Sequence, residues 1–205
     1  IPSLSYQQLK AFHARHYHPS NAVFLTYGDI GAAEHQAKSE QQVLQHFEAQ
    51  ALDFRIPPEH RYSQPQQLQQ PYALIGAEDL SQQTHIVMGW LLGDITDPLE
   101  TLRARILAGV LLDNSSSPLR YALESSELGN APSSLCGLDD NTRELTFSCG
   151  LEGSEPEHQA AVEQLILSTL EQVANQGVDP QQVAAVLHQL ELSQREISGD
   201  GFPYG

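Results

Sequence analysis

Two neighbouring parts of one stretch decide the fold: His85-Ile-Val-Met-Gly-Trp-Leu-Leu92 and, after a short connection, Pro98-Leu-Glu-Thr-Leu-Arg-Ala-Arg-Ile-Leu-Ala-Gly-Val-Leu-Leu112. The first part is an apolar run that is typical of a strand. Before the second part, Asp97 can cap a helix that begins with Pro98. The residues that recur at helical spacing on one face of this helix are Leu102, Ile106 and Val110. The stretch therefore predicts a strand followed by an amphipathic helix.

The same reasoning, carried outward, predicts a series of elements from residue 72 onward. In chain order they are strands at 72–77 and 85–92, helices at 98–112 and 118–128, strands at 131–137 and 144–151, and helices at 156–176 and 180–197. The two later strands form a hairpin around Asp139-Asp140-Asn141. The order ββααββαα favours an antiparallel sheet with helices packed on one face. We therefore expect an α/β chain of the α+β type.

A helix–strand–helix segment is expected before this unit. Ser5 and Gln8 have the spacing of a capping box, which predicts a helix from residue 5 to about residue 17, before Pro19. Ala22-Val-Phe-Leu-Thr-Tyr27 is rich in β-branched and aromatic residues and predicts a buried strand. A polar, Gln-rich helix with one apolar stripe is expected from residue 32 to about residue 50.

Residues 53–71 break these patterns. Their prolines lie among glutamines, and this composition is typical of an extended linker. We therefore expect a domain boundary here.

The charge of the chain is strongly acidic. It contains 26 Asp and Glu residues against 10 Lys and Arg residues, for a formal net charge of −16. Residues 121–205 contain only Arg143 and Arg195 as bases and carry most of the excess. This balance argues against binding to nucleic acid or to an anionic membrane, and it permits attraction of cationic partners. The apolar runs are far too short for a transmembrane helix.

The histidines are the first candidates for chemistry. His13, His16 and His18 lie close together in the sequence, but a metal site would also need a further ligand and supporting hydrogen bonds. His188-Gln-Leu-Glu191 comes closest to the zinc-peptidase motif His-x-x-Glu-His, with Leu192 where the second histidine should be. A single imidazole cannot hold zinc. We therefore predict no catalytic and no metal-binding residue in this chain, and we assign no substrate-binding residue.

The two cysteines, Cys136 and Cys149, are too few for a disulfide framework or a four-thiolate zinc site. Both fall on predicted strands separated by a turn. We expect two reduced, packed thiols.

Several segments together resemble the pitrilysin/insulinase family of zinc metallopeptidases. Those that resemble the close of its first domain are Leu4-Ser-Tyr-Gln-Gln-Leu-Lys-Ala-Phe-His13, His16-Tyr-His-Pro-Ser-Asn-Ala22 and Thr26-Tyr-Gly-Asp29. Those that resemble the second domain of its presequence-protease branch are Ser116-Ser-Pro-Leu-Arg-Tyr-Ala-Leu-Glu-Ser125, Leu128-Gly129, Arg195-Glu196, Gly199, Gly201-Phe-Pro203 and Gly205.

The resemblance implies a clamshell in which two halves, each of two homologous αβ domains, enclose a chamber that degrades unfolded peptides. It implies zinc in the first domain, held by His-x-x-Glu-His and a downstream glutamate, and a catalytically silent second domain that forms a chamber wall. Residues 1–52 would then be the C-terminal tail of the preceding catalytic domain, 53–71 the linker, and 72–205 a second, non-catalytic domain truncated at its C-terminus. The zinc motif would lie upstream of Ile1, so no zinc is expected in this fragment.

Three functions are consistent with these observations. The first is a non-catalytic chamber wall of a zinc metalloendopeptidase, the second an inactive structural or peptide-binding subunit, and the third an unrelated acidic protein-interaction domain. The expected partners are unfolded peptides, including basic ones, and the remaining domains of the same chain. Because a cut sheet exposes an unpaired edge, self-association through the strand at 22–27 is also expected. The two cysteines and the lack of a leader favour a soluble protein of the cytoplasm.

Overall fold

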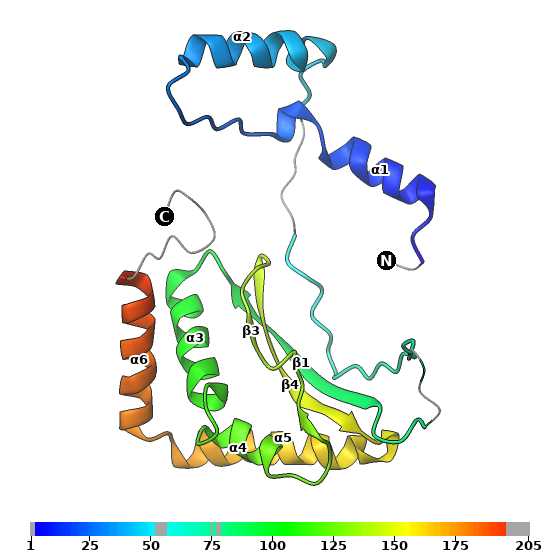
Figure 1. Cartoon of the computed structure of the whole chain (residues 1–205), viewed down its shortest axis with the longest axis vertical. Helices are drawn as coiled ribbons and strands as arrows, with labels where there is room; N and C mark the ends of the chain where they lie inside the picture. Colours follow the sequence, from blue (N-terminus) through cyan, green and yellow to red (C-terminus); the bar gives the residue numbers. More distant parts are fainter. Residues whose placement is uncertain (1–2, 52–56, 75, 77–78, 196–205) are drawn as a thin grey trace. The chain divides into compact units, whose positions relative to one another are not determined.

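The computed structural model describes residues 3–51, 57–74, 76 and 79–195 (Figure 1). The chain divides into two compact units, Ile1–Pro57 and Pro58–Gly205. Residues 196–205, which include the last segments of the family resemblance and the end of the last predicted helix, lie outside the described residues. The same is true of residues 52–56 in and beside the predicted linker. None of the described helices is long and apolar enough to cross a membrane.

The described part of the first unit contains two α-helices, each followed by a short 3₁₀ turn. They are α1 (Tyr6–His16), a 3₁₀ turn at Pro19–Asn21, α2 (Ala32–Gln42) and a 3₁₀ turn at Leu44–His46. The predicted capping box of α1 is confirmed, because the backbone N–H of Gln8 donates to Ser5 Oγ at 3.2 Å and the Ser5 N–H donates to Gln8 Oε1 at 2.8 Å. The second helix ends earlier than residue 50, at the 3₁₀ turn.

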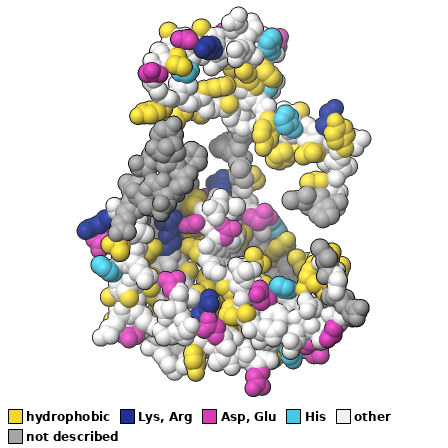
Figure 2. Space-filling view, in the orientation of Figure 1, with side chains coloured by type: hydrophobic (Ala, Val, Ile, Leu, Met, Phe, Trp, Pro, Cys, Tyr) yellow, Lys and Arg dark blue, Asp and Glu magenta, His cyan; other side chains and the backbone are white. Residues whose placement is uncertain are grey.

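The strand predicted at 22–27 is wrong. The backbone is irregular there, and the side chains of Val23, Leu25 and Tyr27 are more than nine-tenths exposed. A strand needs the backbone of a neighbouring strand as its hydrogen-bond partner. The described part of the first unit contains no strand that could pair with residues 22–27. No described residue of this unit is buried, so its apolar side chains, drawn in yellow in Figure 2, gather at the surface.

The second unit has the order βααβββαα. Its elements are β1 (Thr84–Asp94), α3 (Pro98–Leu112), α4 (Pro118–Glu124), β2 (Ala131–Pro132), β3 (Gly137–Asp139), β4 (Glu144–Ser154), α5 (Gln159–Gln176) and α6 (Pro180–Arg195), with a 3₁₀ turn at Pro156–His158 before α5. The predicted start of α3 is confirmed, since the Asp97 carboxylate accepts from the N–H groups of Leu99 and Glu100.

Two predicted strands differ from the observed ones. The strand predicted at 72–77 is wrong: its described positions are irregular, and Gly76 has a φ of +72°, which interrupts an extended run. The strand predicted at 131–137 divides into β2 and β3, because the N–H of Cys136 donates to the Ser133 carbonyl in a turn between them. The expected order ββααββαα is therefore corrected, whereas the hairpin of β3 and β4 is confirmed.

The sheet is antiparallel, with β4 in its centre. β4 pairs with β1, and also with β2 and β3 at different places along its length. The strand residues that contact the core alternate along each strand: Ile86, Met88, Trp90, Leu92, Phe147, Cys149 and Leu151. They pack against buried side chains of α3, α4 and α5, namely Ala108, Leu111, Leu112, Leu119, Leu123, Val162 and Ile166. The helices therefore cover one face of the sheet, as expected for the α+β type.

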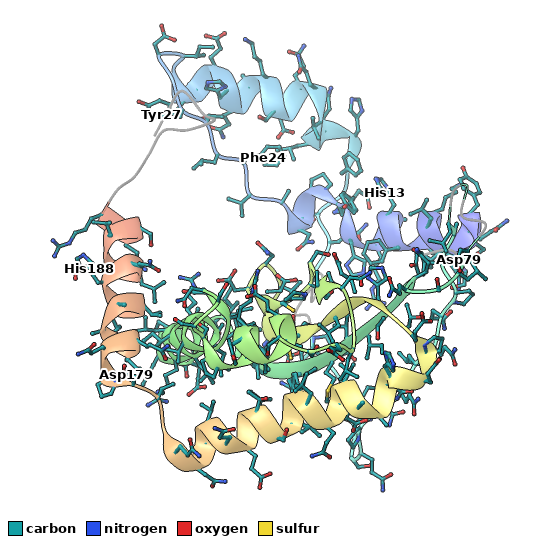
Figure 3. The ribbon with its side chains drawn as sticks, turned by 60° about the horizontal axis from the view of Figure 1, so that its bottom comes forward. His13, Phe24, Tyr27, Asp79, Asp179 and His188 are labelled. Carbon is teal, nitrogen blue, oxygen red and sulfur yellow. The ribbon has the colours of Figure 1, made fainter. Side chains whose placement is uncertain are left out.

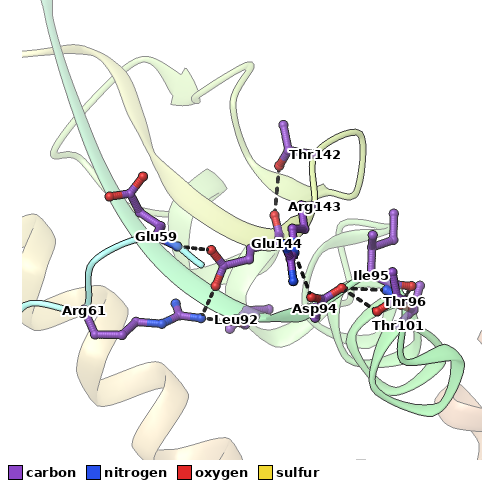
Figure 4. A network of polar contacts seen from close by, with 10 residues as sticks. All are labelled: Glu59, Arg61, Leu92, Asp94, Ile95, Thr96, Thr101, Thr142, Arg143 and Glu144. Carbon is purple, nitrogen blue, oxygen red and sulfur yellow. Dashed lines mark hydrogen bonds and ion pairs between the residues drawn. The ribbon is translucent and has the colours of Figure 1, made fainter. Parts of the chain in front are cut away.

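The turn that connects β1 to α3 is fixed by Asp94 (Figure 4). One oxygen of its carboxylate accepts hydrogen bonds from the N–H and the hydroxyl of Thr96, and the other lies 3.1 Å from Arg143 Nε. These donors favour the charged carboxylate. The hydrogen bonds from Thr96, with that from Arg143, lower the pKa of Asp94 to about 2. The turn thus holds the start of α3 against the sheet with a carboxylate that stays ionised.

The closest approach in the sheet lies between β4 and β1 at Gly150. Gly150 stands opposite Val87, and a Cβ atom at Gly150 would lie 2.0 Å from the carbonyl oxygen of Ile86. That oxygen belongs to the backbone and cannot turn aside, so the two strands would have to separate.

We expect Gly150→Ala to lower the free energy of unfolding by about 2–4 kcal/mol, because the core on both strands would open. Gly93→Ala is the matched control, since its Cβ would lie 3.6 Å from Glu100 Cβ, an ordinary contact. Urea unfolding followed by circular dichroism measures both changes. Equal effects of the two substitutions would contradict the role given to Gly150.

Candidate functional site

The strongest polar contact of the second unit lies where β1 ends and β4 begins. The Glu144 side chain is only 11% exposed, and Arg61 Nη2 lies 2.5 Å from its Oε1. The backbone N–H of Glu59 donates to the other oxygen, Oε2, also at 2.5 Å. Arg61 Nη2 further donates to the Leu92 carbonyl at 2.7 Å. Figure 4 shows both oxygens of this carboxylate held by the segment that precedes β1.

A groove of about 440 Å³ lies between α3, α6 and the β3 region. Three of the four charged side chains that line it are paired: Arg105 Nη2 and Nε lie 2.7 and 2.9 Å from Asp140 Oδ2, and Arg120 Nε pairs with Glu124. The fourth, Asp113, is exposed. The hydrogen bond from Arg120 holds the pKa of Glu124 below its ordinary value. In the described part of the chain every buried side-chain nitrogen and oxygen has a hydrogen-bond partner. The groove therefore offers a ligand no buried polar side-chain atom that lacks a partner.

A second hollow, of about 600 Å³, lies between α4, α5 and the start of α6. Its lining includes small and amide side chains such as Ser116, Thr169 and Gln182. Among the described residues that line it there is no histidine, cysteine or lysine and only one carboxylate, Asp179. No nucleophile–base pair can form from this set.

Three histidines of the first unit, His13, His16 and His18, contact aromatic rings or the backbone. His13 stacks on Tyr17 with ring centroids 4.8 Å apart, and His16 lies 4.4 Å from the Phe12 ring. His18 Nδ1 accepts from the Ser20 N–H at 3.1 Å and caps the 3₁₀ turn. Among the described residues no three His, Cys, Asp or Glu side chains come together in an arrangement that could hold a metal ion. These histidines do not fit a zinc site.

The partial zinc motif on α6 is not assembled either. His188 is exposed and projects outward from α6 (Figure 3), and Glu191 is paired with Arg195 at 2.5 Å. Leu192, in the position of the missing histidine, is 46% exposed. This helix therefore has one imidazole and a carboxylate that is already paired.

The two cysteines are free thiols: Cys149 lies in β4, and Cys136 lies in the turn before β3 with its Sγ near the backbone of Gly150. Cys149 is fully buried, and burial, together with nearby Cys136, raises the pKa of its thiol to about 12. Burial also raises the pKa of Cys136. Because the thiolate is the reactive form, neither residue is activated as a nucleophile.

The other face of the sheet, which does not contact α3, α4 or α5, is a further candidate surface of the second unit. Since the core residues alternate, this face takes the intervening positions of β1 and β4. Those positions include Val87, Gly89, Thr146, Ser148 and Glu152. Val87 is 38% exposed, so this face is open to solvent. Gly89 stands opposite Ser148, so the side chains at the centre of the face are short. It is an open platform on which an extended chain could lie.

Arg61 and Glu144 are the residues that the sequence patterns did not indicate. Arg61 falls in the predicted linker, and Glu144 is one of many acids in an acidic region. The nearest signal in the sequence is that the predicted linker contains two arginines, Arg55 and Arg61, although the chain as a whole has only 10 Lys and Arg residues.

Comparison with known proteins gives a consistent result. Residues 3–190 match the family model described as the Peptidase M16 inactive domain. The mitochondrial presequence protease of Danio rerio is 34% identical over 201 residues, which are 97% of this chain and 20% of that protein. The corresponding protein of Xenopus laevis is 35% identical over 199 residues, 97% of this chain and 19% of the relative.

Presequence protease 1 of Arabidopsis thaliana, named as chloroplastic/mitochondrial, is 34% identical over 208 residues, 100% of this chain and 19% of the relative. The chain thus spans about a fifth of the length of the curated relatives it matches. The third function considered above, an unrelated acidic domain, is excluded. The matched family model is that of the inactive domain, and the relatives are presequence proteases. This chain therefore belongs to the M16 peptidase family.

Proposed function

We propose that this chain is a non-catalytic wall of a zinc metalloendopeptidase that degrades unfolded peptides. The observation that carries the proposal is the match of residues 3–190 to the inactive domain of a peptidase family, together with relatives that are named presequence proteases. The side chains described above support it, because neither the histidines of α1 nor His188 are arranged to bind zinc. Zinc and the catalytic residues would then be supplied by other parts of the parent protein.

The two compact units support the proposed organisation. Residues 1–52 would close the preceding catalytic domain, 53–71 would link it to the next, and 72–205 would form the second, non-catalytic domain. The division of the chain at Pro57 and Pro58 lies inside this linker. The first unit buries no described side chain, so it needs apolar surface from elsewhere. The parent chain is the proposed source, and the segment 22–27 is the part most ready to pair with it.

The sheet face without helices is the surface we propose for contact with peptide. The opposite face is covered by α3, α4 and α5, so only this one can border a chamber. Short side chains at Gly89 and Ser148 allow an extended peptide to approach, and the carboxylates of Asp139 and Glu152 give the face a negative charge. Such a face attracts basic peptides.

Peptide cleavage by the parent and by this chain tests the main proposal. We expect the parent protein to cleave unfolded peptides, to lose activity when a chelator removes zinc, and to regain it when zinc is added. The 205-residue chain, assayed alone with added zinc, should cleave nothing. Chelator-sensitive cleavage by this chain alone would contradict the proposal. A folded parent without activity would instead favour the second function, an inactive structural or peptide-binding subunit.

Reversal of one charge tests the peptide-facing surface. In the parent, Glu152→Lys on β4 should raise the KM for a basic peptide about fivefold and leave kcat nearly unchanged, because it removes ground-state attraction. The matched control is Glu163→Lys, an exposed position on α5, the side of the sheet covered by helices. An equal rise of KM in both variants would show that only net charge matters.

Hydrogen exchange tests the assignment of the first unit. The amides of residues 22–27 should exchange at least about tenfold more slowly in the parent than in the 205-residue chain, because the parent would supply the strand that pairs with them. The amides of α5 serve as the internal control and should not change. Equal exchange of residues 22–27 in both proteins would refute the proposed organisation. Concentration-dependent protection in the short chain would instead reveal self-association through this segment.

A further inference from the structure

β1 has a long free edge. It extends over 11 residues, Thr84–Asp94, and within the described residues only β4 pairs with it, on one side. The N–H and C=O groups on the other side of such a strand are a template for pairing with a second copy of the same chain. A soluble protein with this edge needs something to cover it.

The segment 58–72 is attached near both ends of β1. Arg61 contacts the end of β1 through the Leu92 carbonyl, whereas the Tyr72 hydroxyl donates to the carbonyl of Gln83, just before β1 begins. The Tyr72 ring also meets the His85 ring edge-on, with centroids 5.4 Å apart. The segment therefore runs antiparallel to β1 from one end to the other. We call residues 58–72 the strap.

The strap covers the edge without adding a strand to the sheet. Pro58, Pro65 and Pro71 have no N–H to donate to a ladder, and the described strap is irregular throughout. Its hold on the sheet depends on side chains instead. Between the two ends, Gln67 Nε2 donates to Gln159 Oε1 at 2.7 Å, which ties the strap to the start of α5. A proline-rich segment fixed in this way blocks the edge and offers no new edge of its own.

The firmest of these contacts is the clamp made by Arg61 and Glu144. A register shift between Leu91 and Asp94 leaves the Leu92 carbonyl available at the end of β1, and Arg61 donates to it and to Glu144 at once. Glu144 is 11% exposed, so its charge would be costly without these donors. The bonds are charge-assisted and hold both oxygens.

We propose that the strap is an edge guard: residues 58–72, locked by the Arg61–Glu144 clamp, prevent the free edge of β1 from pairing with a second copy of the chain. This inference concerns the second unit only and does not depend on the proposed peptidase function. Arg61 is a positioning residue whose guanidinium holds the strap in place.

Substitution of Arg61 tests the guard. In the 205-residue chain, Arg61→Ala should make the amides of β1 exchange about tenfold faster at low protein concentration, with no change in α5. At higher concentration the variant should form dimers in sedimentation velocity, and β1 should become protected again. Arg103→Ala is the matched control, because Arg103 also pairs with a carboxylate, Glu100 at 2.8 Å, but on the exposed surface of α3.

Tyr72→Phe provides a second variant that keeps the ring against His85 and removes only the hydroxyl. It should speed amide exchange at the start of β1 and leave exchange at the end of the strand unchanged. Arg61→Lys should show more protection at the end of β1 than Arg61→Ala does. Unchanged exchange in Arg61→Ala would overturn the proposal. So would equal acceleration of β1 and α5, since the clamp would then be a general contact for stability, or a variant that remains monomeric at all concentrations.

Discussion

The antiparallel pairing of β1 with β4 is the interaction on which the second unit depends. β4 is the only strand that joins β1, β2 and β3 in the described sheet, and it approaches β1 so closely at Gly150 that no side chain fits there. Once Ile86 stands opposite Leu151, strand alternation places the apolar side chains of both strands on one face, where the helices can bury them. The same pairing leaves one face of the sheet without helices and one edge of β1 without a neighbouring strand. The face proposed for a peptide and the edge that the strap guards are therefore consequences of the core.

The helices could be predicted from the sequence because their signals are local. Asp97 and Pro98 mark the start of α3, and Gly177, with a φ of +76°, marks the end of α5. Each signal lies within a few residues of the helix end that it marks. Strands are different, since their hydrogen bonds come from distant residues. The segment 22–27 has every local property of a strand and yet lacks a partner among the described residues. The sheet class was predictable, but the limits and number of its strands depended on pairing that no local pattern contains.

The candidate site shows the same division. The prediction that no metal site forms around His13 could be made from the sequence, because no further ligand lies nearby in it. The clamp could not be found in this way, since Arg61 and Glu144 are 83 residues apart and meet only after β1 and β4 have paired. Even the composition of the strap is ambiguous until then. Proline and glutamine residues indicate an extended segment, but its attachment to the rest of the second unit depends on the side chains of Arg61, Gln67 and Tyr72.

Folding also changes the meaning of the charge. The acidic excess of residues 121–205 would be a strong negative field if that region stood alone, but arginines from earlier in the chain cross to it: Arg61 pairs with Glu144 and Arg105 with Asp140. Arg143 makes the reverse pair with Asp94. Much of the negative charge near the sheet ends is thus used in holding the fold. Carboxylates such as Glu152, which forms no ion pair with a described residue, are the ones that remain for a partner. Their place on the face without helices, rather than their number, would determine what the acidic chain attracts.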